Sequence, residues 1–368
     1  MRFLIVIIVL SVTANLLSEE IQPDDNLNIE LTYTADWWHN TQGGLEEGDA
    51  WLDNLDLIID WSLDDNHAIH FHTLANNNKT FSDLVGDIQV ISNIDNDDMI
   101  RLFELWWQYT QESHSLRIGI QDLNADFDAI EPAGYFLNSS HGIGPDYSQS
   151  GMNGPSIFPF SAFGVMHQYQ SDDWTLRWAI RDGSPAENDN PYNQSINFSL
   201  SDLLISSEVE RNSDNLRLAA GIWYYTEKAE KLNNIGTDNN YGIYVLAQYH
   251  LALTDFGELN GWLRYGKANA QLNDVDYYLG AGLTLSQFSH SRHDDIVGVA
   301  IASVSASDAF QNYYENSESG ETNIELTYLI NVNDNFSIQP DIQYVINPGM
   351  DSEIENATVF GIRFVWTL

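Results

Sequence analysis

Apolar and polar residues alternate over long stretches of this chain. Between residues 27 and 37, apolar side chains occupy every odd position and polar ones every even position. The same two-residue period returns over residues 360–368, at the end of the sequence. A β-strand has this period when one of its faces meets an apolar phase and the other meets water.

About sixteen such segments can be counted, and bacterial outer-membrane barrels have an even number of strands. The predicted fold is therefore all-β, a 16-stranded antiparallel transmembrane β-barrel. Pro340 lies inside the fifteenth segment and cannot donate a ladder hydrogen bond, so we expect a bulge there or a strand that starts later. The expected strands are 27–38, 50–62, 67–75, 99–110, 115–122, 161–170, 173–182, 198–210, 215–226, 241–252, 257–268, 275–287, 294–304, 321–331, 335–345 and 357–368.

The links between these segments alternate between short and long. A barrel with short periplasmic turns and long external loops produces this alternation, whereas an up-and-down sandwich in water has no reason to do so. Short links include 64–66, 111–114, 171–172, 212–214 and 332–334. Long links are 39–49, 76–98, 123–160, 183–197, 227–240, 305–320 and 346–356.

The third long link, 123–160, is the longest and is rich in glycine, proline and aromatic residues. A long loop without periodicity in a compact domain is usually functional. Its aromatic content favours a packed loop, so we predict that it folds into the lumen and forms a constriction. The alternative is a loop that stays outside the barrel.

The composition narrows the choice of partners. The chain has 14 Lys and Arg against 54 Asp and Glu, a formal net charge of −40. Nucleic acid is therefore not an expected partner, because phosphate binding needs a basic surface. The acidic excess indicates either a pore mouth that attracts cations or a solvated acidic surface. Cysteine is absent, which excludes disulfides, thiolate metal sites and a catalytic thiol.

The first residues have the features of an export signal. Arg2 is the only charge in residues 1–18, residues 3–10 form an apolar core, and small residues follow. We expect cleavage after Ala14 or Ser18, which leaves 19–368 as the barrel domain. A membrane anchor is the alternative, but the apolar run is short for a spanning helix.

The strand parity indicates which side chains face the lumen. In 99–110, Phe103, Leu105, Trp107 and Tyr109 are expected to face lipid, which places Glu104 and Trp106 inside. The scarce arginines share this inward parity, since charge on the lipid face costs about 2–4 kcal/mol at the midplane. They are Arg117, Arg177, Arg181, Arg217, Arg264 and Arg363.

Two interpretations of these arginines remain open. They could pair with lumen carboxylates such as Glu104, Glu325 and Asp341 and hold the wall rigid, or they could form a charged field that orients a polar solute.

Three tryptophans, Trp106, Trp223 and Trp262, are also predicted to face inward. Aromatic planes could cover the C–H face of a sugar while polar groups bind its hydroxyl rim. Alternatively, the 123–160 loop packs over these rings.

Several stretches, in order along the chain, resemble the carbohydrate-selective porin family of the OprB type. They are 85–94 (VGDIQVISNI), 101–107 (RLFELWW), 116–127 (LRIGIQDLNADF), 136–142 (FLNSSHG), 159–164 (PFSAFG), 321–328 (ETNIELTY) and 338–349 (IQPDIQYVINPG). The resemblance implies a sixteen-stranded outer-membrane barrel that passes monosaccharides, typically glucose, by diffusion. It also implies an inward third loop and a constriction lined by arginines and carboxylates.

The resemblance carries over only part of a functional site. The candidate pore or pore-loop residues that it implies are Arg101, Glu104, Trp106, Arg117, Asp122, Asn124 and Asp126. The chain departs from the family at Leu368, where such barrels commonly end in an aromatic residue, and Trp366 could serve instead as an assembly signal.

Other motifs carry less weight. His67, His70 and His72 lie close together, but no carboxylate joins them at zinc-ligand spacing. Residues 95–98 are acidic but lack the calcium-loop pattern. No phosphate loop or nucleophile elbow occurs, so no cofactor is expected.

Two hypotheses from other classes compete with a porin. One is an outer-membrane lipase that uses the Ser139–His141 stretch, and the other is a secreted sugar-binding sandwich.

The expected function is therefore passive diffusion of carbohydrates across a bacterial outer membrane, not catalysis. A general or cation-preferring porin is the alternative. Expected partners are small sugars, outer-membrane lipid and lipopolysaccharide, the barrel assembly machinery and, as a homotrimer, further copies of the chain.

Overall fold

The computed structural model describes residues 26–76, 80–152, 154–185, 202–253, 257–289 and 292–368. The expected signal peptide, residues 1–18, lies outside this range. Within it, sixteen strands form one closed antiparallel barrel. Each strand pairs with its neighbours in sequence, and β1 closes the barrel against β16. The predicted fold class is confirmed.

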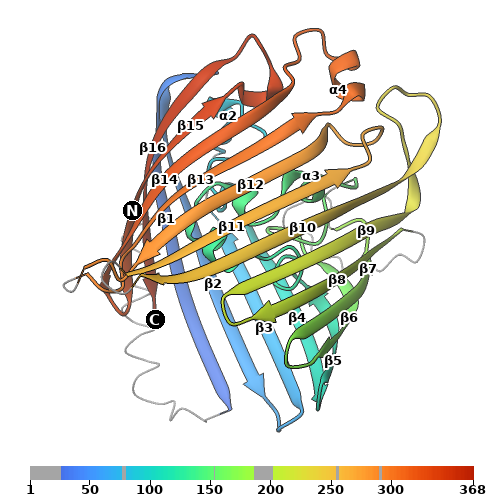
Figure 1. Cartoon of the computed structure of the whole chain (residues 1–368), viewed down its shortest axis with the longest axis vertical. Coiled ribbons are helices and arrows are strands. Elements are labelled where there is room, and N and C mark those ends of the chain that lie inside the picture. The colour runs from blue at the N-terminus through green and yellow to red at the C-terminus, as the bar shows by residue number, and fades with distance from the viewer. Residues whose placement is uncertain (1–25, 77–79, 153, 186–201, 254–256, 290–291) are drawn as a thin grey trace.

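The strands tilt around the barrel, with short turns at one end and longer links at the other (Figure 1). No helix in the described ranges is both long enough and apolar enough to cross a membrane. The strands are β1 (Leu27–Gly44), β2 (Gly48–Ser62), β3 (His67–Asn76), β4 (Met99–Gln111), β5 (His114–Gln121), β6 (Ala162–Gln170), β7 (Trp174–Asp182), β8 (Leu203–Ser213), β9 (Leu216–Glu230), β10 (Thr237–Leu253), β11 (Gly257–Ala268), β12 (Val275–Ser286), β13 (Ile296–Ala306), β14 (Gly320–Asn333), β15 (Phe336–Ile346) and β16 (Glu355–Thr367).

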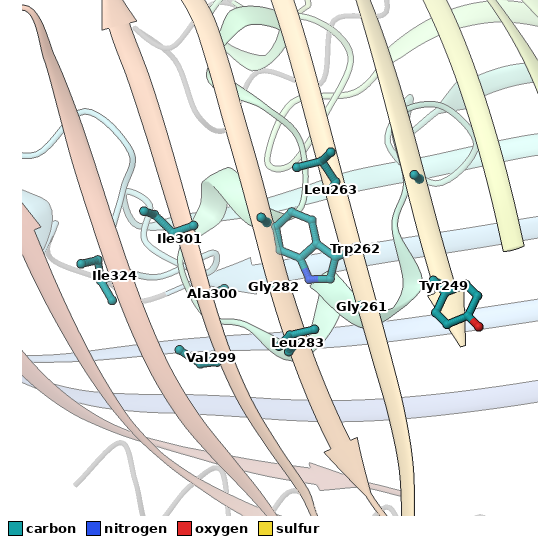
Figure 2. Close-up of a pocket in the computed structure, with 12 residues that line it drawn as sticks. Tyr249, Gly261, Trp262, Leu263, Gly282, Leu283, Val299, Ala300, Ile301 and Ile324 are labelled. Atoms are coloured by element: carbon teal, nitrogen blue, oxygen red, sulfur yellow. The ribbon is translucent and has the colours of Figure 1, made fainter. Parts of the chain in front are cut away.

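The alternating pattern sorts side chains between the two faces of the wall. On β9, Leu218 and Ile222 are 45% and 59% exposed on the outer face, whereas Trp223 is 1% exposed on the inner face. The outer face also has an apolar hollow, where Gly261 lies between larger residues such as Leu263 (Figure 2). Because its surroundings are lipid-facing, we assign this hollow to the bilayer side and not to the solute path.

Two links that we expected to be long are mostly strand. β1 continues to Gly44 and β2 begins at Gly48, so the expected 39–49 link is reduced to a tight turn. Likewise, β9 and β10 extend into 227–240. Beyond the membrane both faces of a strand meet water, and the apolar alternation that marks a strand in the sequence disappears there.

A β-bulge corrects the expected orientation of Phe103. The register against β3 shifts between His72 and Thr73, so that β4 holds one extra residue. Phe103 is therefore 5% exposed and does not face lipid. The bulge also turns both Arg101 and Glu104 inward, although their odd and even positions would place them on opposite faces.

The expected bulge or late start at Pro340 is wrong. β15 runs through Pro340, and its register against β14 is the same before and after this residue. Pro340 also pairs in register with Ile362 on β16. The missing N–H removes a ladder donor without displacing the strand.

Candidate solute pathway

Segment 123–160 folds into the barrel and packs on its inner wall, as predicted for the third loop. It contains η1 (Glu131–Tyr135), η2 (Ser139–His141) and α3 (Pro145–Ser148), and α3 lies against β11 and β12 inside the barrel (Figure 1). Its apolar residues form one buried cluster with the wall, and each large side chain so buried contributes about 1.5–3 kcal/mol. The cluster includes Leu123, Phe127, Ile130, Phe136, Tyr147, Trp223, Tyr244 and Trp262.

Carboxylates on the wall bind backbone N–H groups of this segment. Glu325 on β14 accepts hydrogen bonds from Leu137 N–H at 2.5 Å and Asn138 N–H at 3.1 Å. Glu208 on β8 accepts one from Asp128 N–H at 3.0 Å. A loop buried inside a barrel must satisfy its backbone donors, and these acceptors do so.

A second inward segment, residues 80–98, was not predicted. It contains α2 (Ser82–Val85) and lies against the inner face of the wall at β1 and β14, which are separated by β16 and β15. The Ser92 hydroxyl donates to Asp36 on β1 at 2.7 Å, and Glu321 on β14 accepts from Ile88 N–H at 3.0 Å.

The two inward segments also bond to each other. Asn93 N–H donates to the Leu137 carbonyl at 2.7 Å, and Ser139 N–H donates to the Val90 carbonyl at 3.0 Å. The two segments therefore narrow the bore as one bonded unit.

Two of the predicted arginines anchor this unit. Arg264 is 2% exposed and bonds Asp128 at 2.7 Å and also Asp146, both in segment 123–160. Arg363 on β16 binds Asp36 on β1 through two hydrogen bonds of 2.7 and 2.8 Å and donates a third to the Ser92 hydroxyl of segment 80–98 at 3.3 Å. Such partners offset the free-energy cost of burying a charge.

Two further arginines are buried and have no carboxylate partner in the part of the chain that the structure describes. Arg181 is 0% exposed, lies 5.2 Å from the Phe127 ring, and has no hydrogen-bond partner among the described residues. Arg101 lies 4.7 Å from the Phe160 ring. Both guanidinium groups therefore pack on aromatic rings of the inward segment and its end.

Three other arginines remain in contact with the lumen, with side chains 14–20% exposed. Arg117 bonds Asp126 at 2.6 Å. Arg177 bonds Glu208 and Glu210, each at 2.9 Å, and Arg217 bonds Glu210 at 2.8 Å.

Two of these arginines also bond a glutamine side chain on a neighbouring strand. Gln108 accepts from Arg117 Nε at 3.0 Å, and Gln168 accepts from Arg177 Nε at 2.9 Å. Together these residues form a continuous inner strip across β4 to β9, which we call the polar strip. It consists of Gln108, Arg117, Gln168, Arg177, Glu208, Glu210 and Arg217.

Pairing with lumen carboxylates, one of the two interpretations above, is confirmed for five of the arginines, but the three carboxylates named as examples are not their partners in the described ion pairs. Glu325 binds loop amides, and Glu104 faces His70 and His72 at 3.4 and 4.0 Å. Within the described residues, the ion pairs of the inward arginines use Asp36, Asp126, Asp128, Asp146, Glu208 and Glu210 instead. Parity alone could have pointed to Asp36, which lies on the polar face of the first alternating segment, but it cannot say which partner lies opposite.

The predicted tryptophans do not offer open faces to a sugar. Tyr147 stacks on Trp223 at 5.0 Å, and Trp262 lies under His141 and Phe136. Segment 123–160 therefore covers both rings, which is the alternative considered above.

Trp106 is partly exposed, but its ring also has close neighbours. It stacks with His70 at 4.8 Å, and Arg117 lies 4.2 Å from it. The tryptophans of the wall thus support the structure instead of presenting free stacking surfaces.

The remaining predicted residues lie at the start of segment 123–160. Asp122 N–H donates to Glu104 at 2.9 Å, and the Asp122 carboxylate accepts from Asn124 N–H at 3.0 Å. The Asn124 amide donates to the carbonyls of Phe127 and Gly142 at 3.2 and 3.0 Å. Asp122 and Asn124 therefore shape the loop, whereas Asp126 pairs with Arg117 beside the lumen.

Burial shifts the ionisation of two groups within segment 123–160. It raises the pKa of Asp146 to about 6, although Arg264 acts in the opposite direction. It lowers the pKa of the His141 imidazole to about 3, against the effect of Asp341. His141 is therefore neutral at physiological pH, and the Glu325 carboxylate 3.4 Å away makes no hydrogen bond with it.

A closed barrel with an apolar outer face, a polar bore and an inward loop defines an outer-membrane porin. The family model for the carbohydrate-selective porin, OprB family, matches residues 46–368, and the chain belongs to this family. It is an outer-membrane sugar porin of the Gram-negative type. Family and fold indicate a channel and not an enzyme.

Solved structures agree on the fold. The high-pH structure of Pseudomonas putida OprB is similar with a TM-score of 0.85 and 17% identity, covering 94% of this chain and 95% of that one. The low-pH structure of the same protein has a TM-score of 0.62 and 14% identity, and the match covers 94% of this chain and 93% of that one. OmpT of Vibrio cholerae, in a trimer form, has a TM-score of 0.55 and 10% identity, and the match covers 93% of this chain and 99% of that one. No curated protein sequence matches the chain.

Proposed function

We propose that the chain passes neutral monosaccharides such as glucose by passive diffusion along the polar strip, past a constriction formed by segment 123–160. The observation that carries this proposal is the pairing of Arg117, Arg177 and Arg217 with carboxylates while their side chains stay in contact with the lumen. Each pair is close to neutral overall, yet it offers both donors and acceptors, as sugar hydroxyls require.

Weak binding is part of this mechanism. A solute must bind well enough to enter the narrow zone and weakly enough to leave it. Because the tryptophan faces are covered, hydrogen bonds exchanged with water provide most of the attraction, and their net contribution is only about 0.5–1.5 kcal/mol each. Size exclusion by segment 123–160 then supplies the rest of the selectivity.

The test measures sugar block of ion current through single channels in a planar bilayer. The double variant R117M/R177M removes two donors of the polar strip, so the glucose concentration that halves the current should rise about tenfold. R211M is the matched control, because Arg211 lies beside Trp174 on the outer face. Equal sugar block in all three proteins would contradict the proposal.

A cation-preferring general porin is the second candidate, and the net charge of −40 favours it. The same bilayer separates the two. Strong cation selectivity in a salt gradient, with no block by any monosaccharide or disaccharide, would select the general porin.

Homotrimer formation and contacts with lipopolysaccharide and the assembly machinery remain proposals for this chain. If the chain forms a homotrimer, chemical cross-linking in outer-membrane vesicles would show a band of trimeric mass.

A further inference from the structure

A cluster of metal-ligand type lies on the inner wall, apart from the polar strip. His72 on β3 is directly opposite Glu104 on β4, and His70 is on the same face two residues away. The Glu104 carboxylate is 3.4 Å from His70 Nε2 and 4.0 Å from His72 Nδ1. The three ligand atoms all lie within 4.8 Å of one another. The sequence pattern missed this site because its carboxylate comes from the neighbouring strand.

Each histidine is held by a carboxylate through its other nitrogen. His70 Nδ1 is 2.7 Å from Asp60, and His72 Nε2 is 2.8 Å from Asp56, both on β2. An imidazole that donates to a carboxylate in this way directs the lone pair of its second nitrogen toward the site. This arrangement is common around metal-bound histidines and raises their basicity.

One of the inward nitrogens has no other partner. His70 Nε2 is buried without a hydrogen bond among the described residues. A buried nitrogen left without a partner costs free energy, and a bound cation would recover it. The His70, His72 and Glu104 side chains are only 10–13% exposed, which limits the competition from water.

We propose that His70, His72 and Glu104 bind a divalent transition-metal ion, with Zn²⁺ as the best match. Two imidazoles and one carboxylate are a familiar zinc ligand set, and three protein ligands leave a position open to water or a passing solute. Neighbouring ligands around tetrahedral zinc are about 3.4 Å apart, so binding would shorten the distances between the ligand atoms by at most about 1.4 Å, through small ring rotations.

The position of the site would connect metal binding to the bore. The other oxygen of Glu104 accepts Asp122 N–H at 2.9 Å, immediately before segment 123–160. His70 also stacks on Trp106, whose ring lies beside Arg117 of the polar strip. A bound cation would therefore add positive charge beside the solute path and reduce the cation current.

The experiment titrates the purified full chain in detergent with Zn²⁺ by calorimetry, with excess Mg²⁺ present. Mg²⁺ occupies sites made of carboxylates alone but competes poorly for imidazole nitrogen. We expect a single Zn²⁺ per chain in the wild type, and binding at least about 100-fold weaker in H72N and in E104Q. D56N keeps all three ligands and should weaken binding by about tenfold through the loss of its carboxylate charge.

Two histidine variants serve as controls. H67N removes an exposed histidine that pairs with Asp64, and H167N breaks the His114–His167 contact of 3.3 Å elsewhere on the barrel. Neither should change Zn²⁺ affinity. Unchanged affinity in the H70N/H72N double variant, or loss of binding in H167N, would overturn the proposal. Zn²⁺ should also reduce the single-channel current of the wild type and of H67N, but not of E104Q.

Discussion

At the residue scale, Arg177 shows how a charged side chain is accommodated inside the bore. Its guanidinium contacts Glu208, Glu210 and Gln168, so its charge is balanced without losing contact with the lumen. Removing one partner of such a pair costs far more than the pair contributes, because the other charge is then left without compensation. The strip thus acts as a set of balanced pairs.

Glu210 is the residue on which two of these pairs depend, since it bonds both Arg177 and Arg217. We predict that E210Q leaves an excess positive charge in the narrow zone and lowers the cation-to-anion permeability ratio by about twofold or more. Reversal potentials in a salt gradient measure this ratio. E227Q makes the same charge change at an exposed position on β9 and should alter the ratio much less.

His141 gives segment 123–160 a defined pH dependence. Its folded pKa of about 3 lies below the ordinary value of 6.5, so its contribution to stability is complete above pH 6.5 and is lost as the pH falls toward 3. The loss is about 1.4 kcal/mol for each pH unit in that window. Glu325 and Asp341 are the acidic groups that face it.

Hydrogen exchange of segment 123–160 between pH 7 and pH 5 tests this prediction. Protection, corrected for intrinsic exchange, should fall in the wild type and fall much less in H141F, which keeps a ring against Phe136 and Trp262. H293N changes an exposed histidine and should behave like the wild type. Identical pH profiles for H141F and the wild type would count against the assignment.

At the scale of the element, the inward segments are held by wall carboxylates as much as by apolar contacts. Glu325 binds two consecutive N–H groups of segment 123–160, and Glu321 binds those of Ile88 and Gln89 at 3.0 and 3.1 Å. Bonds to a charged acceptor contribute about 1.5–3 kcal/mol each.

We therefore predict that E325Q loosens segment 123–160 while the barrel stays closed. One oxygen acceptor is lost and the other loses its charge, which should weaken the anchor by about 2–4 kcal/mol. Amide exchange at Leu137 and Asn138 should accelerate by about 100-fold or more, and single-channel current should become noisier. E315Q alters an exposed glutamate and is the control; equal exchange rates in both variants would argue against the anchor.

For the whole molecule, the acidic surface and the balanced strip have different consequences. We expect the net charge of −40 to concentrate cations at the mouths, whereas in the proposed function the paired groups within the bore favour neutral polar solutes. The attraction of cations acts through solvent, over a distance that depends on the salt concentration. The binding of a neutral solute depends on direct contact with the paired groups.

Salt should therefore separate the two effects. Cation selectivity should be clear near 0.1 M KCl and decline toward 1 M, because the screening length falls from about 10 Å to about 3 Å. Sugar block should change little over the same range. Reversal potentials measure the cation selectivity, and the decrease of current on adding sugar measures the block, both over the same series of KCl concentrations. Cation selectivity that stays unchanged at high salt would show that it arises from charges within the bore and not from the acidic surface.

The alternation of apolar and polar residues determined the barrel, the number of strands and the inward parity of the arginines. Each is a local consequence of a strand lying between lipid and water, so it is visible in a few consecutive residues. The inward course of 123–160 was likewise signalled by its aromatic content. Strand ends beyond the membrane, as in β1 and β2, left no such signal.

Only the tertiary structure decided which groups meet inside. The bulge at Phe103 brought Arg101 and Glu104 to one face, and strand register placed Glu104 opposite His72. The second inward segment and the covering of Trp223 and Trp262 are also long-range outcomes. Parity gives the face of a side chain, whereas its partners depend on contacts between residues far apart in the chain, which no local pattern records.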